Sequence, residues 1–251
     1  TSYRYNTRLM FSSRRMMIAS GDEFRDEYSL AFDGTDDYIN FGNVLNLGTG
    51  DFSISIWVKT SDFHDKRFLV KYNDANNRWY VRTNGDNPPK LQFYSKMGGS
   101  DTNGYVGGSG IDLDTLQNQW VHFVISSDRD GNNIGYINGI LDASRSGDAT
   151  DLDQSGNLQI CKYDSTYYDC SISEVAFYDK ALSANEARTI YNSREPFNHK
   201  DSAFSGNLTA WWRMGDGLEN ASGTTIYDMS SNSNNGTMTN MDAVDFEGDT
   251  P

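Results

Sequence analysis

The sequence predicts an all-β fold in which antiparallel strands form two stacked sheets, with one short capped helix. Segment 29–42 has the pattern of a strand, an acidic turn and a second strand, and segment 52–59 is a longer alternating strand. Residues 172–191 have the pattern of a strand that continues into a helix. Aromatic residues make up 13% of the chain, and such side chains favour pleated, half-buried surfaces. Together these features favour a β-sandwich over a parallel α/β fold.

The strands follow one another closely. In segment 52–59, Ser53, Ser55 and Trp57 share one face, and the apolar side chains between them share the other. Further strands are expected at residues 67–72, 78–83, 90–95, 119–127 and 134–137. Asn138-Gly139 is a strong signal for a type I′ turn between two strands. The sheets are therefore expected to be antiparallel.

The helix is expected to begin after Ser183. Ser183 caps it, and Glu186 completes a capping box three residues later. Ala187, Ile190 and Tyr191 give it an apolar stripe, which we expect to pack across a sheet edge.

The charge of the chain excludes several classes of partner. Its 21 Lys and Arg against 35 Asp and Glu give a net charge of −14, which opposes binding to nucleic acid or to an anionic membrane surface. No apolar run is long enough to span a membrane. The Arg14-Arg15 pair is similar to a twin-arginine export signal, but few apolar residues follow it, so export by that route is not expected.

Three segments are expected along the chain. Residues 1–27 form an arm in which five arginines oppose four acidic residues, residues 28–193 form the sandwich, and residues 194–251 are a linker followed by strands. The arm is expected to dock on another subunit or on its own domain, and both alternatives stay open. Its candidate assembly residues are Arg4, Arg8, Arg14, Arg15, Met16 and Met17.

The chain has two cysteines, Cys161 and Cys170. A hairpin centred between Ser165 and Thr166 would place them directly opposite each other. A disulfide and a pair of reduced thiols are then equally acceptable alternatives.

Five strings of residues resemble the laminin-G-like, or concanavalin A-like, jelly-roll family, in the subgroup close to the pentraxins. They are Leu30-Ala-Phe-Asp-Gly with Asp37-Tyr-Ile, Phe52-Ser-Ile-Ser-Ile-Trp-Val, Trp120-Val-His, Gly135-Tyr-Ile-Asn-Gly and Val175-Ala-Phe-Tyr-Asp-Lys-Ala-Leu-Ser. The resemblance spans residues 28–193. It implies two antiparallel sheets, often with bound calcium, and a role in binding glycans or proteins.

The last 58 residues also resemble that family, but in a different order. Trp211-Trp-Arg, followed by Tyr227-Asp and Asn235-Gly-Thr, looks like the stretch that normally precedes the Phe-Asp-Gly strand. Either a second repeat is cut short or these strands close the same sandwich. We expect the second arrangement, because Trp211 and Trp212 need burial.

Asp33, Asp36 and Asp37 form an acidic turn whose hard oxygen ligands suit calcium. The alternative is that the turn is only a hairpin corner. The resemblance favours calcium as a cofactor and adds Glu174 as a contributor to the site. Residues 128–133 look like half of a calcium-binding helix–loop–helix motif, but they lack its glycine and glutamate and are expected to form a turn.

Aromatic side chains near loops are the candidates for glycan binding, because sugar rings stack on aromatic rings while polar neighbours bind the hydroxyls. The candidates are Trp79, Tyr80, Tyr94, Tyr105, Tyr167 and Tyr168. Neighbouring aromatic residues on a strand point to opposite faces, so one of each adjacent pair is expected to be core.

Catalysis is not expected. Family relatives that cleave glucans carry Glu-x-Asp-x-Glu on one strand, whereas this chain has only Glu174 and Asp179 there. His122 alternates with Trp120 and Val124 and is expected to be structural.

Similar members of that family are frequent among the virion proteins of tailed bacteriophages, so the resemblance implies a non-enzymatic surface protein of a virion, of the head-decoration or fibre type. Its arm would bind other virion subunits or copies of itself in a multicopy assembly, and its jelly roll would bind glycans. The first alternative is a secreted or cell-surface, calcium-stabilised carbohydrate-binding module. The second alternative is a degenerate glycoside hydrolase. The expected location is the virion surface or, under the first alternative, the extracellular space.

Overall fold

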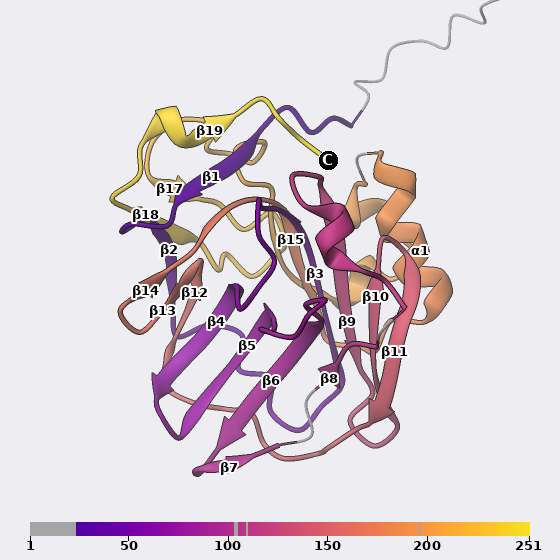
Figure 1. The fold of residues 1–251 in the computed structure, drawn as a ribbon. Coiled ribbons are helices and arrows are strands. Elements are labelled where there is room, and N and C mark those ends of the chain that lie inside the picture. Colours follow the sequence, from indigo (N-terminus) through magenta and orange to yellow (C-terminus); the bar gives the residue numbers. More distant parts are fainter. Residues whose placement is uncertain (1–23, 103–104, 109, 196) are drawn as a thin grey trace, which may run out of the picture.

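Two antiparallel sheets stack face to face, which confirms the predicted all-β jelly-roll sandwich (Figure 1). The computed structural model describes residues 24–102, 105–108, 110–195 and 197–251. Sheet A runs in the order β11 (Ile140–Ser146), β10 (Asn132–Ile137), β9 (Val121–Ser127), β3 (Phe52–Lys59), β15 (Asp169–Tyr178), β1 (Ser29–Asp33) and β19 (Phe246–Glu247), with β16 (Leu208–Trp212) also paired to β15.

Sheet B forms the other layer. Its order is β17 (Thr225–Ile226), β18 (Gly236–Thr239), β2 (Tyr38–Gly42), β12 (Asn157–Ile160), β4 (Arg67–Asp74), β5 (Asn77–Thr83), β6 (Leu91–Met97) and β7 (Ser100–Asp101), with β8 (Tyr105–Val106) paired to β6. A small hairpin of β13 (Lys162–Tyr163) and β14 (Thr166–Tyr167) stands between β12 and β15. Short 3₁₀ turns lie at Leu113–Leu116, Asn192–Arg194, His199–Asp201, Ser205–Asn207 and Ala243–Asp245.

The main core lies between the two sheets. The inward side chains of β3 meet those of sheet B there, as in the contact of Phe52 with Phe93, whose ring centroids are 5.2 Å apart. The other face of β3 is buried as well: Trp57 stacks on His122 of β9 and on Tyr191. Sheet A is thus covered on both sides.

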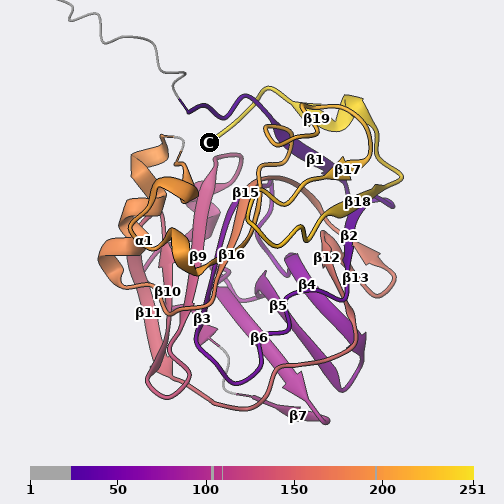
Figure 2. The same cartoon turned by 180° about the vertical axis from the view of Figure 1, so that it is seen from behind.

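The helix α1 (Ala184–Tyr191) supplies part of that cover (Figure 2). Its predicted capping box is present, because Glu186 N–H donates to Ser183 Oγ and Glu186 Oε2 accepts from Ser183 N–H. Ala187 and Ile190 join a second buried cluster with side chains of β9, β10, β15 and β16. The helix therefore packs on the outer face of sheet A, next to the edge strand β11.

The turn between β10 and β11 has the predicted form. Asn138 and Gly139 have φ values of 51° and 70°, as a type I′ turn requires. A Cβ on Gly139 would lie 2.9 Å from the ring of Tyr191, so glycine also permits the close approach of α1.

Strands from the last part of the chain lie in both sheets. β16 pairs with the second half of β15, β18 pairs with β2, and β19 pairs with β1. Trp212 is fully buried between Phe41 of sheet B and Phe177 of sheet A, at centroid distances of 4.1 and 6.0 Å. In the described residues, no helix is long and apolar enough to cross a membrane.

The register of the cysteine hairpin differs from the predicted one. Lys162 pairs with Tyr167 and Tyr163 with Thr166, so the turn lies at residues 164–165, one position before the expected centre. Cys161 consequently lies opposite Tyr168, whose N–H it accepts at 3.1 Å. Its thiol still meets that of Cys170, with 2.8 Å between the Sγ atoms, because β15 leaves the hairpin for sheet A.

Candidate functional site

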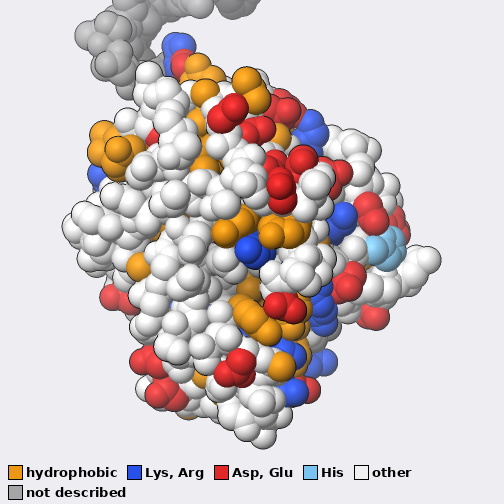
Figure 3. Space-filling model, turned by 90° about the vertical axis from the view of Figure 1, so that its left-hand side faces the viewer, with side chains coloured by type: hydrophobic (Ala, Val, Ile, Leu, Met, Phe, Trp, Pro, Cys, Tyr) orange, Lys and Arg blue, Asp and Glu red, His pale blue; other side chains and the backbone are white. Residues whose placement is uncertain are grey.

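The solvent side of sheet B carries a continuous group of tyrosines and arginines. Inward residues of β5 such as Trp79 and Val81 enter the core, so the residues between them point outward. We call this group the tyrosine–arginine face; its members are Tyr72, Tyr80, Tyr94, Tyr163, Tyr168, Arg67, Arg78 and Arg82. Figure 3 shows hydrophobic and basic side chains gathered together on this side of the molecule.

The face is built by stacking. Tyr80 of β5 and Tyr94 of β6 are paired across the strands, with ring centroids 4.8 Å apart and planes inclined by 15°. The Arg82 guanidinium lies 5.4 Å from the Tyr80 ring centre and 5.8 Å from that of Tyr94. On the other side, Arg67 lies 4.7 Å from the ring centre of Tyr163 and 5.2 Å from that of Tyr80. Each cation is thus held against aromatic rings.

Hydrogen bonds fix the polar ends of these side chains. Arg67 Nη1 donates to Tyr168 Oη at 2.7 Å, and Arg82 Nε donates to Gln92 Oε1 at 2.5 Å. Tyr94 Oη donates to Asp101 Oδ1 at 2.5 Å. Burial, together with this bond, raises the pKa of Tyr94 to about 12, so its hydroxyl stays protonated at neutral pH. The face therefore places partly exposed rings, those of Tyr72, Tyr94 and Tyr163, beside oriented N–H donors.

The structure places the predicted glycan residues differently. Tyr80, Tyr94 and Tyr168 lie in the face, although Tyr80 and Tyr168 are only 4% and 6% exposed. Trp79 is fully buried in the core between Phe93 and Phe177, which corrects its selection as a ligand residue. Tyr167 packs on Tyr38 instead, with ring centroids 6.1 Å apart.

Tyr105 begins β8, and its side chain lies outside the described residues. The sequence reasoning missed Tyr72, Tyr163 and the three arginines. The alternation Arg78-x-Tyr80-x-Arg82 on one strand was the signal that could have identified part of the set.

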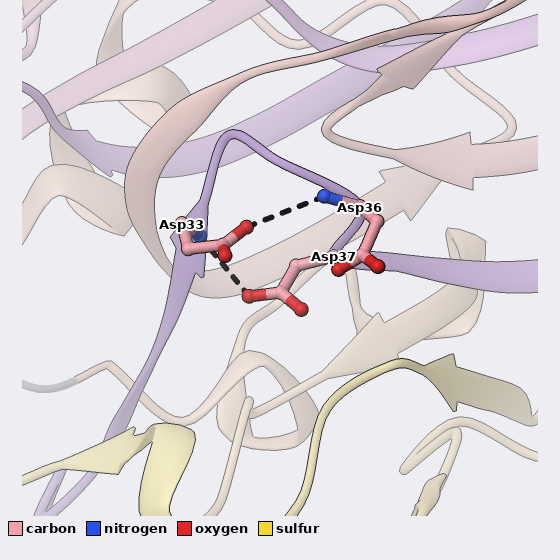
Figure 4. A group of neighbouring side chains, drawn as sticks. All are labelled: Asp33, Asp36 and Asp37. Carbon is pink, nitrogen blue, oxygen red and sulfur yellow. Dashed lines mark hydrogen bonds between the residues drawn. The ribbon is translucent and has the colours of Figure 1, made fainter.

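The acidic turn between β1 and β2 brings its three carboxylates together (Figure 4). Oxygen atoms of Asp33, Asp36 and Asp37 lie within 4.8 Å of one another. Asp33 Oδ1 accepts the N–H groups of Thr35 and Asp36, which closes the turn, and Asp37 Oδ2 accepts Asp33 N–H. The hydrogen bond from Thr35 lowers the pKa of Asp33, whereas burial raises the pKa of Asp37. One oxygen of Asp33, one of Asp37 and both of Asp36 are not used in these bonds.

Glu174 does not belong to that turn, which corrects its inclusion as a metal ligand. Asp33 pairs with Asp169, and Glu174 lies five residues further along β15, roughly 15 Å away at strand spacing. Glu174 is buried, with hydrogen bonds from Trp211 Nε1 and from Arg213 Nε. Burial, and then the nearby Asp26 carboxylate, raise the pKa of Glu174 well above its ordinary value. This side chain is a buried structural partner of Arg213.

A second acidic group was not predicted. Asp51, Asp128 and Asp130 bring carboxylate oxygens within 4.8 Å of one another beside the loop that joins β9 to β10. The turn expected at residues 128–133 is present, because Asp128 N–H donates to Asn132 O and Gly131 N–H donates to Asp128 O. Asp51 was missed because it reaches this turn from a distant part of the sequence, where Arg129 N–H donates to its Oδ1 at 2.9 Å.

The assembly residues Arg4, Arg8, Arg14, Arg15, Met16 and Met17 lie outside the described residues. The described end of the arm contacts its own domain. Phe24 packs on Trp211, and the Arg213 guanidinium lies 4.2 Å from the Phe24 ring centre. Arg213 also pairs with Asp26 at 3.0 Å, and Asp216 accepts the N–H groups of Glu27 and Tyr28. Residues 24–28 are therefore fixed to the body of the protein.

Comparisons with known proteins agree with this fold. A laminin-G family model, described as the concanavalin A-like lectin/glucanases superfamily, matches residues 33–188 of the chain. Botulinum neurotoxin type E from Clostridium botulinum is 27% identical over 199 residues, which are 73% of this chain and 15% of the toxin. The chain thus spans only a small part of the length of that relative.

Two solved structures share the architecture. A Bacteroides ovatus protein, named as a candidate carbohydrate-binding protein, superposes with a TM-score of 0.61 and 17% identity, over 86% of this chain and 58% of that one. A heptameric pentraxin of the SAP-like type from Limulus polyphemus gives a TM-score of 0.51 and 14% identity, over 66% of this chain and 82% of that one. At these identities the likeness concerns the fold.

Proposed function

The chain belongs to the concanavalin A-like lectin/glucanases superfamily, and on that premise we propose that it binds carbohydrate, without cleaving it, through the tyrosine–arginine face. The observation that carries the proposal is the stack of Tyr80 and Tyr94 with Arg82 laid against both rings. Aromatic rings match the C–H faces of sugars, and guanidinium N–H groups donate to hydroxyl or carboxylate oxygens. The Bacteroides ovatus protein that shares the fold supports the same ligand class.

The non-catalytic part of the proposal is supported by the carboxylates of β15. Hydrolysis of a glycoside needs two accessible carboxyl groups on either side of the bond. Glu174 is buried and held by Trp211 and Arg213, and Asp179 at the far end of the strand accepts a hydrogen bond from Asn207. The arrangement of Glu174 and Asp179 therefore does not favour the second alternative, the degenerate glycoside hydrolase.

The test is a glycan array, followed by calorimetry with the glycan that binds best. Tyr94→Ala and Arg82→Gln are each expected to weaken binding about tenfold, because each removes a ring or a set of donors from the face. Tyr227→Ala is the matched control, since Tyr227 is also a partly exposed tyrosine but follows β17, away from the face. Thermal unfolding would check that each variant is folded. An array without a hit, or equal losses in all three variants, would refute the proposal.

We also propose that the acidic turn binds calcium. The cluster of three carboxylates, including both oxygens of Asp36 that accept none of the hydrogen bonds of the turn, supports this, and the remaining ligands would be water. Calcium is expected to raise the melting temperature, chelator is expected to reverse the rise, and Asp36→Asn is expected to abolish it. Asp130→Asn, in the second acidic group, is the control variant and is expected to keep the rise in melting temperature. An unchanged melting temperature at millimolar calcium would argue that the turn is a hairpin corner only.

For the arm we propose a role in assembly, with a virion as the predicted setting. The support is that Arg213 and Asp216 hold residues 26–28, the described end of the arm, against the body of the protein. Deletion of residues 1–23 is expected to convert an oligomer or a particle-bound form into a free, folded monomer. Light scattering would measure this, and an unchanged mass after deletion would contradict the role.

A further inference from the structure

Cys161 and Cys170 lie where the chain passes from one sheet to the other. Cys161 directly follows β12 of sheet B, and its N–H donates to Phe68 O of β4. Cys170 lies in β15 of sheet A, opposite Phe32 of β1. Their Sγ atoms are 2.8 Å apart, and a disulfide bond of about 2.05 Å would need only a small shift of the two side chains. A covalent bond here would join the two sheets.

The residues between the two cysteines contact the tyrosine–arginine face and its border. Tyr163 packs on Tyr72 and Tyr80, with centroid distances of 5.2 and 5.6 Å. Lys162 Nζ lies 3.8 Å from the ring centre of Tyr38. The β13–β14 hairpin, drawn beside β12 and β4 in Figure 1, thus covers one end of the face, and its two strands pair with each other rather than with a strand of either sheet.

Both thiols are buried, but they differ in their position relative to solvent. Cys161 is fully buried, and Cys170 is 3% exposed and borders a cleft of about 190 Å³ together with Lys59 and Asn118. Cys170 is therefore the nearer of the two to a small molecule in that cleft. Cys161 is then in position to react with whatever is bound to Cys170.

We propose that Cys161 and Cys170 form a redox modification site, which a low-molecular-weight disulfide such as oxidised glutathione converts into an intrachain bond that ties the hairpin to both sheets. The Cys170 thiolate attacks one sulfur of the small disulfide and releases one small thiol, leaving a mixed disulfide. Cys161 loses its proton, attacks Cys170 Sγ and releases the second small thiol. Two protein thiols are oxidised, one small disulfide is reduced to two thiols, and the protons end on those thiols.

The bond would restrict the hairpin in the folded protein and the chain in the unfolded one. Tyr163 would then be held on Tyr80 more of the time. A tighter glycan complex in the oxidised protein follows from this, and that consequence rests on the proposed function. The formation of the bond and the restriction of the hairpin do not depend on the proposed function.

The experiment incubates the full chain in graded ratios of reduced and oxidised glutathione. Alkylation and mass spectrometry of the peptide that contains residues 161–170 would count the thiols, and hydrogen exchange would follow residues 162–168. We expect both thiols to disappear together in monomeric protein, hairpin exchange to slow by about tenfold, and the melting temperature to rise by about 5 °C. The Cys161→Ala variant is expected to stop at the glutathione adduct of Cys170. Its hairpin exchange and its melting temperature are expected to stay unchanged.

The proposal is overturned if both thiols survive an excess of oxidised glutathione, if oxidation yields dimers, or if hairpin exchange is the same in both redox states. A protein that forms the bond and slows its hairpin, but binds no glycan in either state, refutes the proposed function and leaves the redox site supported. A protein that binds glycan equally in both states refutes only the tightening of the complex.

Discussion

Lys71 shows how a single residue can conflict with its surroundings. It lies on β4 with its side chain turned inward, and it is fully buried. Its Nζ donates to Asn43 Oδ1 at 2.8 Å and to Val44 O at 2.6 Å, and neither acceptor is a carboxylate. Burial lowers the pKa of Lys71 to about 8. The folded protein therefore carries a cation that water would solvate better.

Lys71→Met is expected to raise the free energy of unfolding at pH 7 by about 1–3 kcal/mol, because it removes the cost of burying the charge. Between pH 8 and 10.5 the unfolded lysine binds a proton that the folded one has lost, so wild-type stability rises with pH and the advantage of the variant shrinks. Urea unfolding at pH 7 and 9.5 measures this, with Lys90→Met as the partly exposed control. An advantage that grows with pH would contradict the assignment.

His122 gives a second prediction at this scale. It packs against both Trp57 and Tyr191, its Nε2 is 2.7 Å from Ser55 Oγ, and burial lowers its pKa to about 3. The sequence predicted a structural histidine, and these contacts agree with that reading. Below pH 6.5 the histidine is protonated in the unfolded protein but stays neutral in the folded one. The free energy of unfolding therefore decreases as the pH falls.

His122→Phe keeps an aromatic ring and removes this titration. Relative to the variant, the wild type is expected to lose up to about 1.4 kcal/mol of stability per pH unit between pH 6 and 4. Denaturant unfolding of both proteins across that range measures the difference. The carboxylates titrate in both proteins, so the difference isolates His122 together with its interaction with His199. A difference that does not depend on pH would show that the folded state accepts the proton.

Among the secondary-structure elements, α1 is stabilised both by its local capping box and by its packing on sheet A. Its capping box closes the first turn, and its apolar stripe covers the outer face of sheet A. Ser183→Ala is expected to cost about 1 kcal/mol, because one N–H group at the start of the helix loses its acceptor. Chemical denaturation checks this, with the exposed Ser231→Ala as control. Equal stability of the two variants would mean that tertiary contacts alone hold the helix.

Closure of the sandwich belongs to the scale of the whole molecule. β16, β18 and β19 pair with β15, β2 and β1, so three strands from the end of the chain complete a structure begun near its start. Removal of residues 208–251 would expose Phe41 and Phe177 and leave strand edges open. We expect the shortened protein to lose cooperative urea unfolding, measured by tryptophan fluorescence and circular dichroism. A sharp transition at an unchanged midpoint would show that residues 24–207 fold alone.

The sequence was sufficient to predict those features that depend on a single local pattern. Alternation in β3, the Asn138-Gly139 turn and the Ser183–Glu186 box each depend on residues within a few positions of one another, and each is present as predicted. It was insufficient where distant segments meet. Trp79 and Tyr80 look equivalent in sequence, but the pleat of β5 sends one into the core and the other to the face.

An antiparallel sandwich with one capped helix follows from the sequence alone, because strand alternation, turn chemistry and helix capping act over short distances along the chain. Which side chains share a surface depends on the tertiary structure. It placed Arg67, Tyr163 and Tyr94 on one face, set Glu174 against Arg213, and brought Cys161 to Cys170 across a shifted hairpin. Each of these neighbours depends on strand order and register, which arise from packing across the sheets and which no single segment encodes.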